Sequence, residues 1–274
     1  MTLRYEHFRD LHRSPGAPLL LPNAWDHASA AALAAAGFRA VGTTSLGVAA
    51  SAGLPDGNGS GAAREETLRL ARGLARLSVL VSVDIEGGFS DHPEEVAALA
   101  VKLAEAGIVG VNIEDGRADS TLADLDRQCA VLRAVKEATD GRLFVNARTD
   151  TYWLPGAHVT QTEDRLAAYE QAGADGLFVP GLRDVRTITR LASKLTAPLN
   201  ILHSPDGPSL PELAAAGVRR VSCGSLLFRA ALRGAVAAAE AVRDGSGPLP
   251  AGIPSYAETQ ALSDAFASAA VTRG

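Results

Sequence analysis

Acidic side chains stand at the ends of two apolar segments of this 274-residue chain. The stretch VSVDIEGG, residues 81–88, begins as a buried strand and ends in Asp84 and Glu86, while VNIED, residues 111–115, ends in Glu114 and a further aspartate. Residues i and i+2 of a strand point to the same face, so Asp84 and Glu86 would stand side by side. At about 5 Å and an effective dielectric near 20, two carboxylates repel by roughly 3 kcal/mol. Either a bound cation relieves this repulsion, or some of the carboxyl groups keep their protons at raised pKa values.

A cation is the stronger interpretation, and the ligand types indicate which one. Oxygen ligands without clustered histidine or cysteine suit Mg²⁺ or Mn²⁺ rather than zinc. We predict that Asp84 ligates the metal directly and that Glu86 and Glu114 do so directly or through water. The alternative is that these acids cap the following helices or pair with arginines. We expect Asp115 and Asp150 to orient neighbouring groups rather than to touch the metal.

The elements that must position these acids read as alternating strands and helices. Helical patterns end at Gly37, Gly107, Gly173 and Gly217, each followed within three residues by a β-type run, and glycine there supplies the left-handed conformation that ends a helix. The eight predicted strands are residues 18–23, 39–45, 79–86, 109–115, 143–149, 176–181, 199–203 and 219–225. This order predicts an α/β fold of the (β/α)8 TIM-barrel type, whose strand ends converge on one mouth. A doubly wound sheet would have fewer strands and a glycine-rich nucleotide loop, which the early turn PNAWDHAS lacks.

Other segments fill in the organisation. Ser209-x-x-Glu212 and Thr160-x-x-Glu163 have capping-box spacing and predict two helix starts. Residues 46–65 read as a long loop of small residues. We divide the chain into a barrel over residues 1–244 and, over residues 245–274, a linker with one C-terminal helix at about residues 256–270.

Composition excludes several function classes. The formal net charge is −5, whereas nucleic-acid-binding proteins usually carry a basic face. No apolar run approaches the roughly 18 residues that span a bilayer, and the N-terminus lacks the apolar core of a signal peptide. The two cysteines, Cys129 and Cys223, form no CxxC spacing, so structural zinc is not expected and a reduced cytoplasmic setting is.

Six motifs give the chain a family resemblance. LPNAWDHASA, SLG, GLPDG, SVDIEGGF, NIEDG and NARTD follow one another in this order and resemble the isocitrate lyase and phosphoenolpyruvate mutase superfamily, and the resemblance as a whole runs over about residues 19–229. The resemblance implies a (β/α)8 barrel, Mg²⁺ dependence and small 2-oxo or 2-hydroxy carboxylic acid substrates. It further implies C–C or P–C bond chemistry through a Mg²⁺-bound enolate. It also implies a homotetramer, a dimer of dimers, whose last helix is exchanged with a neighbouring barrel.

The same resemblance assigns residues to roles. Catalytic roles fall on Asp56 in a gating loop, on Arg148, which grips the substrate and stabilises enolate charge, and on Glu114, which completes the metal's water shell. Guanidinium suits that grip because it stays charged and donates two parallel hydrogen bonds. The metal-centre acids are Asp84 and Glu86. The residues expected to contact substrate are Ser45, Leu46, Gly47, Asp84, Arg148 and Asn200.

Departures from the family pattern bear on the reaction. The KKCGH motif of the true lyases is replaced by GRADSTLAD, residues 116–124, and the glutamate expected after the sixth strand is Pro180. We therefore expect water or a lid residue to supply the proton. The predicted function is a Mg²⁺-dependent carbon–carbon lyase acting on a 2-oxo or 2-hydroxy di- or tricarboxylic acid, by cleavage or decarboxylation. Two alternatives are a phosphonopyruvate hydrolase or other P–C bond enzyme, and a 2-oxo-acid-binding protein without turnover.

Overall fold

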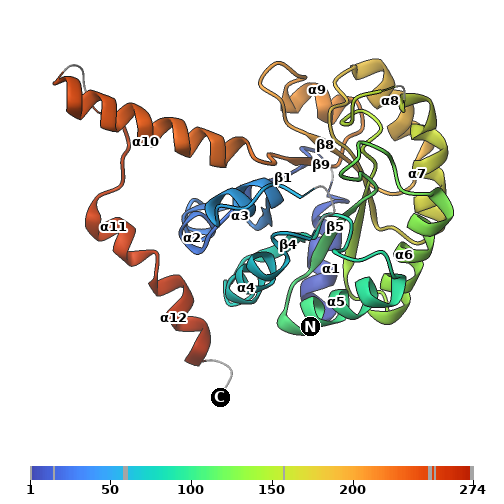
Figure 1. The fold of residues 1–274 in the computed structure, drawn as a ribbon, viewed down its shortest axis with the longest axis horizontal. Coiled ribbons are helices and arrows are strands. Elements are labelled where there is room, and N and C mark those ends of the chain that lie inside the picture. Colours follow the sequence, from blue (N-terminus) through green and yellow to red (C-terminus); the bar gives the residue numbers. More distant parts are fainter. Residues whose placement is uncertain are drawn as a thin grey trace.

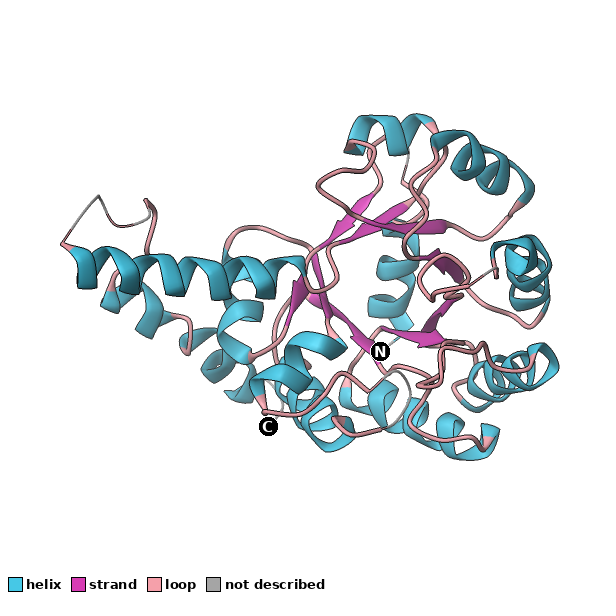
Figure 2. Cartoon of the chain, turned by 45° about the horizontal axis from the view of Figure 1, so that its top comes forward, coloured by secondary structure: helices cyan, strands magenta, loops and turns pink. Residues whose placement is uncertain are grey.

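A parallel sheet curls into a nearly closed barrel at the centre of the molecule (Figures 1 and 2). The computed structural model describes residues 2–14, 16–57, 61–156, 158–245, 249 and 251–271. Its strands are β1 (Leu19–Leu21), β2 (Asn23–Ala24), β3 (Ala40–Thr43), β4 (Leu80–Asp84), β5 (Gly110–Glu114), β6 (Phe144–Arg148), β7 (Gly176–Val179), β8 (Leu199–Leu202) and β9 (Arg220–Ser222).

Two short strands share the first position of the barrel. β1 pairs with β9 and β2 pairs with β3, and only Pro22 separates β1 from β2. Proline has no N–H group to donate to a ladder, so the strand is interrupted there. The nine strands therefore fill eight positions, which confirms the predicted α/β barrel of the TIM type.

Helices surround the barrel as the alternating pattern predicts (Figure 1). They are α2 (His27–Ala35), α3 (Ser45–Ser51), α4 (Arg64–Leu74), α5 (Pro93–Ala106), α6 (Leu125–Ala138), α7 (Thr162–Gln171), α8 (Val185–Lys194) and α9 (Leu210–Ala215), with a 3-10 turn at Val159–Gln161. All four glycines predicted to end helices adopt positive φ, between 88° and 105°. These four helix ends are confirmed.

Two local predictions are wrong. The segment after β3 is not a continuous loop, because its first residues form α3 (Ser45–Ser51). Residues 58–60 of that segment lie outside the described residues. Ser209 and Glu212 form a capping box at α9, but Thr160 lies in the 3-10 turn and α7 starts without a side-chain cap. Because that turn precedes α7 directly, its backbone takes the place of a capping residue.

An N-terminal helix, α1 (Thr2–Leu11), closes the end of the barrel opposite the mouth. Phe8 is fully buried, and it packs in one cluster with Leu21 of β1 and with Leu80 and Phe144, the first residues of β4 and β6. Below them His12 stacks on the Phe144 ring, with centroids 4.2 Å apart. Burial lowers the pKa of His12 to about 3, so this imidazole is neutral at physiological pH. The barrel floor is thus an apolar plug.

The C-terminal region differs from the single helix expected. After β9, α10 (Leu226–Asp244) projects away from the barrel. Helices α11 (Tyr256–Ala261) and α12 (Asp264–Val271) then lead back toward the barrel (Figure 1). Leu262 and Ser263 separate α11 from α12, so two short helices replace the one predicted. The Phe266 ring of α12 packs against the His27 ring of its own barrel, with the ring centroids 5.3 Å apart. None of the described helices is long and apolar enough to cross a membrane.

Candidate active site

Polar side chains gather inside the barrel and at its mouth. Along each strand, successive side chains point alternately into the barrel and away from it. Asp84, Glu114 and Arg148 are the last residues of β4, β5 and β6, and Glu114 and Arg148 are register partners. Carboxyl ends of parallel strands open on one face in this fold. The structure therefore brings the predicted metal acids and the predicted substrate arginine to the same mouth.

Arg148 lies between two carboxylates. Its Nη1 lies 2.6 Å from Glu114 Oε2, and its Nε donates to Asp150 Oδ1 at 2.6 Å. Its guanidinium also stacks near the Trp153 and Phe178 rings, 5.9 and 5.7 Å from their centroids. Burial by itself lowers the pKa of Arg148, but the carboxylates of Glu114 and Asp150 raise it overall, so the group stays charged. The arginine is thus oriented before any ligand arrives.

Asp84 and Glu86 are brought together by a turn rather than by a strand. β4 ends at Asp84, and Glu86 has a left-handed φ of 50°. The Glu86 N–H donates to Asp84 Oδ1 at 3.3 Å, and the Asp84 N–H donates to Thr43 Oγ1 at 2.8 Å. Both acids are buried. The strand does not continue to Glu86, so the same-face strand geometry predicted for Asp84 and Glu86 is wrong.

Burial, together with nearby negative charge, raises carboxyl pKa values at the mouth. Burial raises the pKa of Glu114 well above its usual range, and the Asp150, Asp84 and Glu86 carboxylates raise it further against the pull of Arg148. Burial likewise raises the pKa of Asp56, and Asp84 adds to that shift. Among the described residues no three acids, histidines or cysteines already surround a common point. Glu114 points to Arg148 instead, which is where the structure departs from the predicted three-acid cluster.

The other predicted site residues fall in two places. Ser45, Leu46 and Gly47 form the first turn of α3, and the Ser45 side chain hydrogen-bonds the Asp56 carboxylate, so the segment predicted to gate the site lies against the start of α3. Asn200 is the second residue of β8 and is fully buried in the barrel, not at the strand's end. Its Oδ1 accepts from Ser222 Oγ at 3.4 Å. Cys129 lies buried within α6.

A polar layer inside the barrel was not foreseen. Asn112 Oδ1 accepts from Asn146 Nδ2 at 2.9 Å and from Arg220 Nη2 at 3.1 Å. Burial lowers the pKa of Arg220 to about 9. The signal was present, because Asn112 and Asn146 each stand two residues before Glu114 and Arg148 and so share their inward face.

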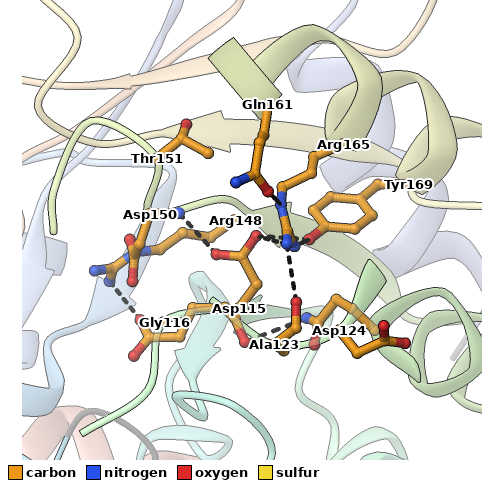
Figure 3. A network of polar contacts seen from close by, with 12 residues as sticks. Asp115, Gly116, Ala123, Asp124, Arg148, Asp150, Thr151, Gln161, Arg165 and Tyr169 are labelled. Atoms are coloured by element: carbon orange, nitrogen blue, oxygen red, sulfur yellow. Dashed lines mark hydrogen bonds and ion pairs between the residues drawn. The ribbon is translucent and has the colours of Figure 1, made fainter. Parts of the chain in front are cut away.

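A second unforeseen set of residues surrounds Asp115 (Figure 3). Asp115 is fully buried and accepts hydrogen bonds from the Tyr169 hydroxyl at 2.6 Å and from Arg165 Nη1 at 3.2 Å. These two side chains come from α7, 50 residues or more along the chain. The expectation that Asp115 and Asp150 orient neighbours matches these contacts.

Comparison with known proteins places this geometry in a family. The family model described as phosphoenolpyruvate phosphomutase matches residues 8–243. An uncharacterized protein of Mycobacterium tuberculosis is 46% identical over 255 residues, which is 93% of this chain and 95% of that protein. An oxaloacetate decarboxylase of Pseudomonas putida is 32% identical over 183 residues, covering 62% of this chain and 60% of its own length.

A solved structure supports the same conclusion at the level of the fold. The phosphoenolpyruvate phosphomutase of Streptomyces platensis superimposes with a TM-score of 0.83 at 24% identity, covering 98% of this chain and 99% of that one. With the family model matching most of the chain over a TIM-type barrel, the protein belongs to the phosphoenolpyruvate mutase and isocitrate lyase superfamily.

Proposed function

We propose that the protein is a Mg²⁺-dependent carbon–carbon lyase that acts on a small 2-oxo or 2-hydroxy di- or tricarboxylic acid, including oxaloacetate. The observation that carries the proposal is Arg148, which lies at the barrel mouth between Glu114 and Asp150 with 12% of its side chain exposed. A charged guanidinium held in place is suited to bind a carboxylate and to stabilise negative charge that develops beside it. The similarity to an oxaloacetate decarboxylase supports this substrate class.

The chemistry of the donors fits a hard divalent cation. Asp84, Glu86 and Glu114 offer only oxygen, which suits Mg²⁺ or Mn²⁺. Their crowding raises the pKa of Glu114, first through burial and then through the neighbouring carboxylates, and a cation would relieve that repulsion. We assign Asp84 as the direct ligand, with Glu86 and Glu114 acting directly or through water. When bound, the metal acts as a Lewis acid that polarises the substrate's oxo group.

The chain's own residues account for the rest of the reaction. In decarboxylation of oxaloacetate, the bond between C3 and C4 breaks, its electron pair delocalises onto the C2 oxygen, and CO₂ leaves. Arg148 would hold the substrate and donate hydrogen bonds toward that developing charge. Ser45 and the first turn of α3 would hold the C1 carboxylate, with Asp56 closing above them. C3 then takes a proton from water or from a residue of the gating segment, which yields pyruvate.

The test is product formation by the purified protein. With Mg²⁺ and a panel of 2-oxo and 2-hydroxy acids that includes oxaloacetate, we expect release of pyruvate or a related oxo acid, measured with a coupled dehydrogenase. Because Mg²⁺ alone promotes decarboxylation of oxaloacetate, the control is the Arg148→Lys protein at the same metal concentration. A wild-type rate no higher than this control, across the whole panel, would refute lyase function.

Two other outcomes identify the alternatives. Phosphate release from phosphonopyruvate would make the protein a P–C bond enzyme. Mg²⁺-dependent binding of oxalate or 2-oxoglutarate, without product after long incubation, would make it a binding protein.

We also propose that a second copy of the chain covers α10, within a homotetramer. All of α10 is described, and Phe228 is its only buried residue, whereas Leu232 and Val236 share one face and are about half exposed. Light scattering after size exclusion should give the mass of four chains. Leu232→Glu with Val236→Glu should lower that mass, and Arg233→Gln on the same helix should not. A monomeric wild type would contradict this proposal.

A further inference from the structure

Asp115 is the centre of a buried network behind Arg148 (Figure 3). Its Oδ2 accepts from the Tyr169 hydroxyl and from Arg165 Nη1, and its Oδ1 accepts from the main-chain N–H of Asp150 at 2.8 Å. Arg165 and Tyr169 stand four residues apart, on one face of α7. The carboxylate of Asp115 therefore joins the end of β5, the segment after β6 and a helix outside the barrel.

This network is expected to add little to the free energy of unfolding. Asp115, Arg165 and Tyr169 are all buried. Removing an ion pair from water costs free energy that the attraction repays only with very good geometry, so such pairs often add little net stability. Burial raises the pKa of Tyr169 well above its usual range, and the Asp115 carboxylate adds to that shift, so the hydroxyl remains a donor. What the network does supply is a defined position for the groups bonded to it.

Asp150 links the network to Arg148 and fixes the position of its guanidinium. Its main chain is held by Asp115, and its carboxylate accepts from Arg148 Nε at 2.6 Å. On the other side, a Cβ added to Gly116 would collide with Asp150 Oδ2. The φ of Gly116 is not positive, so the glycine is required by this close approach rather than by backbone conformation. Asp150 thus has little room to move away from Arg148.

Arg165 also fixes the segment that replaces the family's cysteine motif. Its Nη2 donates to the Ala123 carbonyl at 3.0 Å, and the Ala123 N–H donates to the Asp115 carbonyl at 2.7 Å. Residues Gly116 and Leu122 close this segment as an isolated bridge. Arg165 of α7 therefore anchors both the loop that follows Glu114 and, through Asp115, the groups that hold Arg148.

We propose that Asp115, Arg165 and Tyr169 are positioning residues that set the Arg148 guanidinium through Asp150. None of the three is assigned a contact with substrate. The inference rests on the proposed function only in giving Arg148 a ligand to hold. Its structural part, the dependence of Arg148 geometry on the Tyr169 hydroxyl, is measurable without any ligand.

The experiment compares two tyrosines in similar settings. Tyr169→Phe removes one donor to Asp115. The matched control is Tyr5→Phe, because the Tyr5 hydroxyl donates to Asp175 at 3.1 Å and that carboxylate also pairs with a lysine, at the opposite end of the barrel. Gly116→Ala is the second test variant, since it displaces the Asp150 carboxylate and leaves the Tyr169 hydroxyl in place.

Two readouts separate positioning from simple stabilisation. The first is the Nε–H signal of Arg148 in ¹⁵N NMR spectra of the ligand-free protein, assigned by its loss in Arg148→Lys. The second is the affinity for oxalate with Mg²⁺, by calorimetry. We expect Tyr169→Phe and Gly116→Ala to shift the Arg148 signal and to weaken oxalate binding by about fivefold, the scale of one net hydrogen bond. Tyr5→Phe should change neither, although it lowers the melting temperature.

The outcomes are distinct. If Tyr169→Phe lowers the melting temperature as Tyr5→Phe does, but leaves the Arg148 signal and oxalate affinity as in the wild type, the network is merely structural and the inference is wrong. If the wild type itself binds no oxalate, the Arg148 signal alone decides the inference, and the proposed function is judged by product release. A shifted Arg148 signal in Tyr169→Phe would still support positioning in that case, and an unshifted one would refute it.

Discussion

Asp84→Asn is expected to lower Mg²⁺-dependent product formation on the order of 10³-fold, which corresponds to several kcal/mol of lost metal-dependent stabilisation. Asp84 is buried at the end of β4, and its main-chain N–H donates to Thr43, so its short side chain starts from a fixed point. Asparagine keeps the size of the side chain but removes its charge. The measurement is the steady-state rate with excess Mg²⁺, together with Mn²⁺ affinity by electron paramagnetic resonance.

The control for Asp84→Asn is Asp91→Asn. Asp91 follows the same strand and is largely exposed, in a surface pair with Arg127. It should keep wild-type turnover and wild-type Mn²⁺ affinity. An Asp84→Asn protein that binds Mn²⁺ as tightly as the wild type would remove Asp84 from the metal site and would undermine the proposed mechanism.

Arg148→Lys should reduce kcat/KM by about 10² to 10³-fold. This is the usual effect of removing a preorganised hydrogen-bond donor that faces the substrate atom on which negative charge develops. Lysine keeps a positive charge, but it lacks the planar pair of donors that Arg148 directs at Glu114 and Asp150. Fluorescence and circular dichroism should show a folded protein. Oxalate affinity in calorimetry should fall in parallel with kcat/KM.

Arg142→Lys serves as the matched control for Arg148→Lys. Arg142 stands just before the same strand, at the barrel's opposite end, and more than half of its side chain is exposed. Its substitution should leave kcat/KM within about twofold of the wild type, as usual for surface positions. If Arg148→Lys also retained wild-type kcat/KM, the arginine would not be the substrate grip.

Local sequence signals predicted the elements well. Gly37, Gly107, Gly173 and Gly217 end helices because a left-handed residue is a local requirement, which needs no distant partner. Helix α3 escaped prediction since its small residues resemble a loop, and its burial against Trp25 and Phe228 is decided elsewhere in the chain. The missing cap of α7 has the same origin, because the preceding 3-10 turn depends on the path of the chain from β6.

The position of a predicted site residue in the fold followed from the sequence where one strand carried the information. Asp84, Glu114 and Arg148 end three successive barrel strands, and convergence of strand ends follows from the fold class alone. The geometry among them did not follow. Glu86 reaches Asp84 through a left-handed turn, and Glu114 faces Arg148 rather than a shared centre, because pairing across the mouth depends on side-chain contacts between strands.

The amino-acid sequence by itself determined the barrel, the order of its strands and the identity of the acids and the arginine at its mouth, since periodicity, glycine ends and strand-end residues are local properties. Only the tertiary structure decided that Asp115 meets Arg165 and Tyr169, from residues 50 and 54 positions away. Contacts of that separation leave no periodic trace in the chain, so they emerge only when α7 packs against the barrel and its side chains reach the end of β5.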